Sequence, residues 1–450
     1  MNIGLARFLG PEEYGNALLI INVILIFNVF MTNGLYQSLV QYSGNTAIDL
    51  RDLWRKAFVL QIATSAVLMA INLSIAWPLA QIFGEPQLLY PFLLLAIVIP
   101  ANGLYYCQIG MLNGMHRFKQ QATASVIYSL VRVVLIFGIL LIFKMPLYAI
   151  ILGTFVAYAI AYFYADSQWS YHTGTETVAS RTLFMDAVRF IGLFIFITLF
   201  MNVDFFILKS LCDDKILIGQ YGAMINVGKM IYFFVFSFTN TFYPVSLRLF
   251  GENNLGAIRS RLRDINSILI AFSFACIIGT YYFDAEIIQL LFGSEYVQGG
   301  SMLMLYCTAI ILLSISVLYS HILSVFKSRR APIYAFSIAL AVFVGASVQL
   351  YPYLGLYSVL YSFIICQLLL FVFLAVLLRR YLSGYIPVRY LVVSSLIAGA
   401  SIGLSLFADA PFSFLFRTLL SGVSIIAIAF SSRLLYSLFV KYFRHYILKR

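Results

Sequence analysis

Four ionisable side chains lie well inside long apolar stretches of the sequence: Arg132, Arg189, Asp204 and Lys229. If these stretches cross a membrane, a charge at the bilayer centre costs about 2.5–3.5 kcal/mol, so each needs a partner, a water-filled cavity or a route to the surface. Arg offers a planar fork of donors and Lys a mobile point charge, and both bind anions. The pattern indicates an anion-binding site within the apolar layer. The alternative is that a cation pairs with a helix carbonyl or a nearby acid and only stabilises packing.

The composition places these residues in a membrane protein. Of the 450 residues, 62% are apolar and only 10% are charged, whereas roughly a quarter are charged in soluble domains. A soluble enzyme is excluded, because it would need more polar residues to cover its surface. The net charge of +12 does not indicate nucleic-acid binding, since the basic residues lie in short tracts between apolar runs. The cysteines and histidines are scattered, so no metal or cofactor site is predicted.

The sequence predicts an all-α, polytopic integral membrane protein. Since a spanning helix needs about 20 apolar residues, the predicted spans lie at about 15–40, 57–79, 88–112, 122–143, 146–166, 187–210, 219–246, 265–283, 301–326, 333–350, 355–378, 389–408 and 413–438. Gly10-Pro11 is typical of the turn after a helix. We therefore expect a truncated first helix before these spans, and an intact architecture of about fourteen spans.

Lys and Arg residues predict the orientation. Most of them lie in one alternate set of connections and in the C-terminal tail, whereas the opposite set holds only Arg7, Lys144, Lys209 and Lys215. Basic connections are typical of the cytoplasmic side. We expect a multi-pass protein of the cell inner (cytoplasmic) membrane with a cytoplasmic C-terminus.

The depths of the four ionisable residues differ. Arg132 and Lys229 each lie about ten residues into a span, roughly 15 Å deep at the helical rise. One cation from each half of the chain is therefore expected near the midplane of the membrane. Arg189 lies close to the cytoplasmic end of its span, where an Arg side chain reaches the headgroups. Asp204 lies nearer the outer end of the same span, and either pairs with Lys229 or titrates during ion coupling.

An internal repeat predicts the domain organisation. At a nearly constant offset, Tyr14-Gly15 recurs as Tyr221-Gly222, Phe83-Gly84 recurs as Phe292-Gly293, and a basic connection follows both Asn113 and Ser324. Parallel repeats are related by an axis along the membrane normal and place a substrate path between them. We expect an N-terminal lobe (1–180), a C-terminal lobe (181–385), and two additional helices with a basic tail (386–450). The alternative is that outer turns simply favour aromatic-Gly pairs.

Six motifs resemble those of the Wzx-type polysaccharide (O-antigen) flippases, a branch of the multidrug/oligosaccharidyl-lipid/polysaccharide exporter superfamily. The first is LARFLGPEEYG near the N-terminus, and the others are MLNGMHRFKQQ (111–121), NVDFFILKSL (202–211), IGQYGAMINVGKMIYFF (218–234), YPVSLRLF (243–250) and LLFGSEY (290–296). The resemblance implies fourteen helices in two lobes around a central cavity. It also implies transport, by alternating access, of an undecaprenyl-diphosphate-linked oligosaccharide for O-antigen, capsule or exopolysaccharide biosynthesis.

For such a substrate, Arg132 and Lys229 are the expected ligands of the diphosphate, with Arg189 and Asp204 as further site residues. The expected partners are the lipid-linked oligosaccharide, membrane lipid, H⁺ or Na⁺ as a coupling ion, and a polysaccharide polymerase; no cofactor and no nucleic acid are expected. Two alternatives remain. A membrane polymerase, ligase or glycosyltransferase would present acid/base groups on an outer loop, and a cation-coupled multidrug exporter would favour intramembrane acids.

Overall fold

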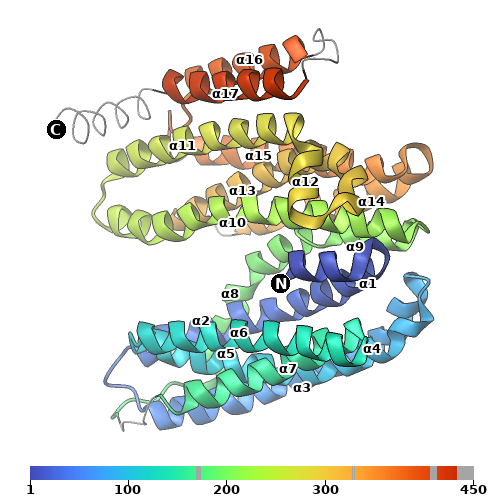
Figure 1. Ribbon diagram of the computed structural model, residues 1–450. Helices are drawn as coiled ribbons and strands as arrows, with labels where there is room; N and C mark the ends of the chain where they lie inside the picture. Colours follow the sequence, from blue (N-terminus) through green and yellow to red (C-terminus); the bar gives the residue numbers. More distant parts are fainter. Residues whose placement is uncertain (169–173, 327, 329, 406–412, 433–450) are drawn as a thin grey trace, which may run out of the picture. The chain divides into compact units, whose positions relative to one another are not determined.

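The protein folds into helices throughout the part that its structure, a computed structural model, describes: residues 1–168, 174–326, 328, 330–405 and 413–432 (Figure 1). Within these residues the one extended pairing is an isolated parallel bridge between Ile48 and Glu176. The predicted all-α class is confirmed. The chain forms two compact units, Met1–Gly222 and Ala223–Arg450, which we call unit 1 and unit 2.

Unit 1 begins with a long, interrupted helix and ends inside α10. Its helices are α1 (Asn2–Phe30), α2 (Tyr36–Ser43), α3 (Leu50–Ile82), α4 (Leu89–Leu94), α5 (Val98–Gly114), α6 (Phe118–Phe143), α7 (Pro146–Asp166), α8 (Ser180–Phe200), α9 (Val203–Leu211) and the start of α10 (Lys215–Gly251). A π-helical turn, Met31–Leu35, joins α1 to α2. Within α1, Gly10 is non-helical (φ 72°, ψ 170°), at the point where the sequence predicts the end of a first helix.

Unit 2 contains the rest of α10 and the remaining helices. These are α11 (Leu255–Tyr282), α12 (Asp284–Phe292), α13 (Leu303–Val325), α14 (Arg330–Leu354), α15 (Leu356–Arg379), α16 (Val388–Ser405) and α17 (Ser413–Ser431). Helices α16 and α17 pack on each other and on α11. The buried cluster between these three helices includes Ile278, Tyr282, Ala398 and Ile428.

The helices are long enough to cross a membrane. Among the described residues, 11 helical segments are both long and apolar enough, and the bent pair α8–α9 makes up to 12. The apolar helix Phe416–Ser431 is shorter, and the predicted spans 389–408 and 413–438 fall partly outside the described residues. With 33 residues, α3 is about 50 Å long at the helical rise and exceeds the hydrocarbon core of about 30 Å. The chain is a multi-pass membrane protein.

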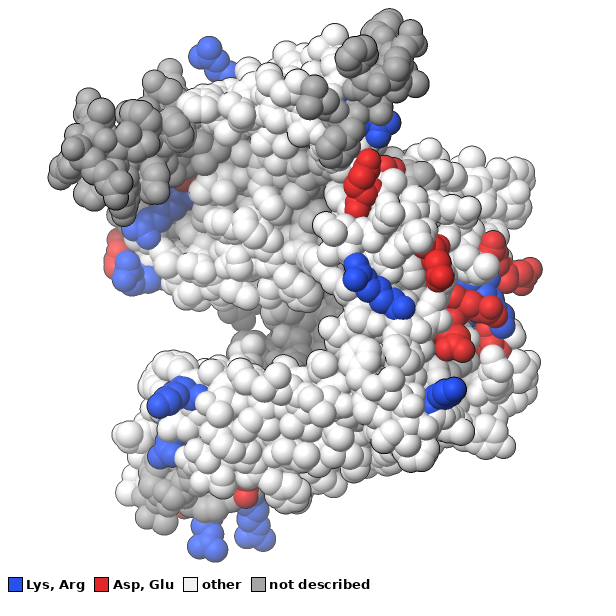
Figure 2. Space-filling view, in the orientation of Figure 1, with Lys and Arg blue, Asp and Glu red and all other residues white. Residues whose placement is uncertain are grey.

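Apolar side chains cover most of the lateral surface of each unit. On the face shown in Figure 2 the surface is mainly uncharged, and Lys, Arg, Asp and Glu residues gather near its edges. Inside unit 1, α5 packs against α2, α3 and α7; inside unit 2, α13 packs against α11 and α15. Because lipid cannot hydrogen-bond the backbone, each helix satisfies its own peptide groups.

Local sequence explains where several helices begin and end. The side chain of Asp49 caps α3 by accepting hydrogen bonds from the backbone N–H groups of Arg51 (2.8 Å) and Asp52 (3.3 Å). Pro146 occupies the first turn of α7, where its missing N–H costs nothing. Gly84 (φ 62°) and Gly293 (φ 111°) follow α3 and α12, and their backbone conformation favours glycine. Both repeated Phe-Gly pairs therefore end a helix.

A glycine contact holds the start of α10 against α1. A Cβ atom at Gly219 would overlap the carbonyl oxygen of Pro11, and one at Gly222 would lie 2.5 Å from Leu18 Cδ2 and 3.7 Å from Tyr14 Cε1. A Cβ atom at Gly15 would in turn lie 3.3 Å from Ile218 Cγ2. The two Tyr-Gly pairs matched in the sequence therefore lie on helices in contact with each other. Small residues allow such close backbone approach between helices in lipid.

The substitution Gly219→Ala tests this contact. Because the overlapped atom belongs to the backbone, it cannot rotate away, and we expect a loss of about 1–3 kcal/mol of stability from overpacking. The measurement is the thermal midpoint of the purified protein in detergent. The matched control is Gly138→Ala, where no atom lies within 4 Å of the added Cβ; the higher helix propensity of Ala leaves it neutral or slightly stabilising. Equal midpoints for the two variants would contradict the contact.

A buried ion cluster joins the connection after α3 to α9 and α10. The carboxylate of Glu85 lies 3.3 Å from Lys209 Nζ and 3.1 Å from Lys215 Nζ, and accepts a hydrogen bond from Gln87 (2.5 Å). Glu85 and Lys209 are only 4% and 5% exposed. Burial raises the pKa of Glu85, but the hydrogen bond and charge of Lys215 and the charge of Lys209 outweigh burial, so the pKa lies below its ordinary value.

The substitution Glu85→Gln tests the ion cluster. It leaves Lys209 buried without its counter-charge, and breaking a buried pair costs about 3–5 kcal/mol. Because the pKa of Glu85 is lowered by folding, its contribution is present above the ordinary value of 4.5 and is lost as the pH falls through the lower folded value. The wild type should therefore lose stability in acid through this group, and the variant should lack that component.

The control for this variant is Glu252→Gln. Glu252 forms an exposed pair with Arg248 at 3.7 Å, and such pairs contribute about 0–1 kcal/mol. Thermal midpoints in detergent across an acid-to-neutral pH series measure both effects. A Glu85→Gln protein as stable as the Glu252→Gln protein at neutral pH would show that the buried cluster is not stabilising.

Candidate functional site

Arg132 lies about midway along α6, with its side chain directed at α7. Its Nε donates a hydrogen bond to Thr154 Oγ1 of α7 (3.1 Å), and its Cζ lies 5.8 Å from the ring centroid of Tyr128. Helices α6 and α7 pack along each other (Figure 1). The bond to Thr154 uses one of the five N–H donors of the guanidinium. Among the described residues, no carboxylate forms an ion pair with Arg132.

A cluster of tyrosines adjoins this guanidinium through Tyr128. The rings of Tyr128 and Tyr158 stack with centroids 4.4 Å apart, and Tyr105 lies 5.5 Å from Tyr128 and 5.4 Å from Tyr158. Tyr106 extends the cluster, at 5.1 Å from Tyr105 and 6.4 Å from Tyr158. Tyr105 and Tyr158 are buried, whereas Tyr128 and Arg132 are half-buried. The positive charge is thus held by neutral hydroxyl and aromatic groups, and keeps donors for an anion.

Asp204 lies in the first turn of the short helix α9. The predicted span 187–210 is interrupted: α8 ends at Phe200, α9 begins at Val203, and the two are bent by 40°. Asp204 is fully buried, and the hydroxyl of Tyr221 donates a hydrogen bond to its Oδ2 (3.1 Å). A helix N-terminus carries partial positive charge, so this position stabilises a carboxylate. Asp204 therefore has a local structural partner in Tyr221.

The structure gives less detail on the surroundings of Lys229 and Arg189. Lys229 is half-buried in the part of α10 that belongs to unit 2, whereas Arg132 and Asp204 belong to unit 1. The expected pairing of Asp204 with Lys229, and the expected sharing of one cavity by Arg132 and Lys229, stay predictions. Arg189 lies in α8, but its side chain is outside the described residues.

Sequence reasoning missed the tyrosines around Arg132. A signal was present, because Tyr128 and Arg132 are four residues apart and so share one face of a helix. Thr154 and Tyr158 on α7 have the same spacing. What could not be read was that these two faces meet, and that α5 adds Tyr105 and Tyr106.

Solved structures with the same fold are membrane transporters. The lipid II flippase MurJ in an inward closed conformation matches with a TM-score of 0.71 and 13% identity, over 95% of this chain and 94% of that chain. A multidrug resistance MATE family transporter of the MOP superfamily in an inward-facing conformation matches with 0.69 and 14%, over 85% and 93%. A MOP superfamily transporter from Pyrococcus furiosus, whose binding pocket has reverse polarity, matches with 0.58 and 14%, over 84% and 90%.

Sequence comparison identifies the family. A search of curated proteins finds no match. A family model described as polysaccharide biosynthesis protein matches residues 4–299, which is more than half of the chain. The resemblance drawn from the six motifs is confirmed at the level of family and fold. The chain belongs to the polysaccharide biosynthesis protein family and has the fold of the transporters and flippases of the MOP superfamily.

Proposed function

We propose that this protein is a flippase that moves undecaprenyl-diphosphate-linked oligosaccharide units across the cytoplasmic membrane by alternating access. The observation that carries the proposal is Arg132, a cation midway along a spanning helix that is held by Thr154 and Tyr128 rather than by an acid. A diphosphate must lose much of its hydration to cross the apolar layer. A guanidinium with unused N–H groups offsets that loss through charge-assisted hydrogen bonds.

The remaining parts of the proposal follow from the same chemistry. Lys229 supplies a second cation from unit 2, so that each lobe contributes one charge to the path. The lobes are residues 1–180 and 181–385, and the helices after 386 are additional. With the basic connections and the C-terminus in the cytoplasm, the membrane potential favours outward movement of negative charge by about 2.3 kcal/mol per charge per 100 mV. Exchange of H⁺ or Na⁺, with Asp204 as the titrating group, is a second energy source to be tested.

The product would supply a polysaccharide polymerase that builds O-antigen, capsule or exopolysaccharide. As a flippase, the protein in this proposal neither makes nor breaks a covalent bond. Its family description refers to polysaccharide biosynthesis, and the step within that role that this proposal assigns to it is translocation of the lipid-linked unit.

Reconstitution in proteoliposomes with undecaprenyl-diphosphate-linked oligosaccharide tests the proposal. An impermeant glycosidase added outside measures how much sugar has crossed. Loss of a charge-assisted hydrogen bond costs about 1.5–3 kcal/mol, so we expect Arg132→Ala to lower the flipping rate about 10- to 100-fold. Arg132→Lys keeps the charge but loses the planar fork, and should retain part of the rate. Lys229→Ala should also lower it.

The control is Arg380→Ala, because Arg380 is exposed just after the end of α15. If a folded wild type moves no lipid-linked sugar, the flippase proposal fails; protection of cells against cationic drugs would then indicate an exporter. If wild type and Arg132→Ala flip equally well, the function stands and Arg132 is excluded from the path.

A further inference from the structure

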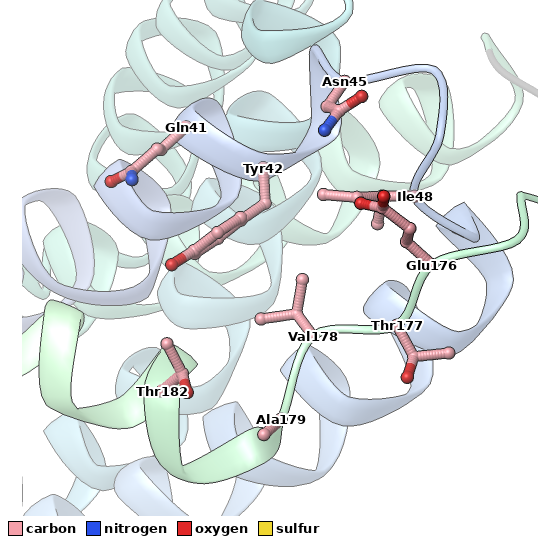
Figure 3. A pocket seen from close by; sticks show the side chains of 9 residues that line it. All are labelled: Gln41, Tyr42, Asn45, Ile48, Glu176, Thr177, Val178, Ala179 and Thr182. Atoms are coloured by element: carbon pink, nitrogen blue, oxygen red, sulfur yellow. The ribbon is translucent and has the colours of Figure 1, made fainter.

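Two adjoining pockets of mixed polarity border the end of α2, and their residues have no role in the transport path described above. The first, of about 620 Å³, has polar side chains from Gln41, Tyr42, Asn45, Glu176, Thr177 and Thr182. Figure 3 shows the α2 residues on one side of this pocket and the segment before α8 on the other. The second, of about 480 Å³, lies between the same helix end and the turn after α5. Gln41 and Asn45 line both pockets, so the two adjoin at these side chains, and together we call them the α2-end groove.

Close backbone packing fixes the walls of the α2-end groove. A Cβ atom at Gly44 would lie 2.7 Å from the carbonyl oxygen of Gly114, so only glycine allows α2 and α5 to end side by side. On the other wall, the backbone of Glu176 donates to Ala47 O and accepts from Asp49 N, both at 2.9 Å. Lys56 Nζ donates to Val178 O (2.9 Å) and holds the same segment. The groove is therefore preorganised, which lowers the entropy cost of binding.

The chemistry of the walls fits hydroxyl-rich, uncharged ligands. Among the described residues, no Lys or Arg lines either pocket. Side-chain amides both donate and accept hydrogen bonds, and a carboxylate such as that of Glu176 can accept hydrogen bonds from two hydroxyl groups at once. The ring of Tyr42 is fixed by a hydrogen bond from its hydroxyl to Asp186 Oδ2 (2.7 Å). One lining carboxylate, Glu176, a second one behind Tyr42, and no lining cation disfavour a phosphate and favour a sugar.

The second pocket supplies a wall of different character. It is lined by Asn113, His116 and Phe118, which belong to the MLNGMHRFKQQ motif. His116 has a positive φ of 57°, a strained conformation for a residue other than glycine, and such strain is found mainly at functional sites. Its ring packs edge-on against Phe118 at 5.6 Å. An aromatic face beside amides and an imidazole is a second surface on which a sugar ring can lie.

We propose that the α2-end groove binds the oligosaccharide of the lipid-linked substrate, on the side that the charge asymmetry predicts to be cytoplasmic. This rests on the proposed flippase function and assigns its sugar, rather than its diphosphate, to a separate subsite. Each of the two pockets, at about 620 and 480 Å³, lies within the range of about 300–1,000 Å³ typical of small-molecule sites. Their extension on both sides of α2 suits a chain of several sugars. The groove then selects substrates by their glycan before the diphosphate enters the path.

Binding of free glycan to the full-length protein in lipid nanodiscs tests this assignment. The probes are the oligosaccharide released by mild acid from the lipid-linked donor, without its diphosphate, and inorganic pyrophosphate. Saturation-transfer NMR gives contacts and dissociation constants. The variant is Gln41→Ala combined with Asn45→Ala, which removes the two side chains shared by both pockets. The control is Thr46→Ala, an exposed neighbour that lines neither pocket.

We expect the wild type and the Thr46→Ala protein to bind the free glycan equally, and the double variant to bind it at least about tenfold more weakly, since two hydrogen-bonding groups are lost. Pyrophosphate should not compete. In the proteoliposome assay the double variant should raise the donor concentration for half-maximal rate with little change in the maximal rate. An unchanged thermal midpoint shows that the double variant is folded, and Gln41→Ala alone serves if it is not.

The outcomes separate this inference from the proposed function. If the wild type flips the donor but binds no free glycan, or if the double variant binds glycan as well as the wild type does, the sugar subsite is overturned and the flippase stands. If the wild type binds glycan through Gln41 and Asn45 but flips nothing, the flippase fails and the sugar site stands. Competition by pyrophosphate would assign the groove to the anion and overturn the inference.

Discussion

The close contact between α1 and the first turns of α10 is the constraint on which the architecture depends. Helix α10 begins in unit 1 and continues into unit 2, and its first turns lie against α1, with Gly219 against the backbone of Pro11 and Gly222 against the side chains of Leu18 and Tyr14. In water, burial of apolar side chains would drive such packing, but lipid is as apolar as the side chains. Close backbone approach is then the main source of attraction, so glycine at these positions is a steric requirement.

The second constraint on the structure is how its buried charged groups are compensated. The described charges inside unit 1 are held in different ways: Glu85 by two lysines, Asp204 by a tyrosine hydroxyl at a helix start, and Arg132 by a threonine and a ring face. In the first, opposite charges compensate each other. In the second, a helix dipole and a hydroxyl compensate an anion. Of these three, the third is a cation with neutral partners, and this difference is the reason for proposing Arg132 as the binding group.

Much of the fold could be predicted from sequence because apolar run length determines a membrane helix, and the predicted spans correspond to helices throughout the described residues. The positions of the helix ends could not be predicted in this way. Helices α3 and α10 are longer than the apolar layer is thick, and beyond that layer hydropathy does not indicate whether a segment is helical. The break after Phe200 carries no Gly or Pro, and only Asn202 indicates local competition for backbone hydrogen bonds. The tyrosine cluster and the partners of Glu85 depend on contacts between distant segments, which periodicity within one helix does not contain.

The bridge between Ile48 and Glu176 has a mechanical consequence. It clamps the beginning of α8 to the beginning of α3, while the far end of α8 meets the interruption before α9. Between α8 and α9 the ladder of helical hydrogen bonds is interrupted. The interruption lies at Asn202, next to Asp204. The beginning of α8 is thus tied to α3, whereas its helical ladder is broken beside the carboxylate of Asp204.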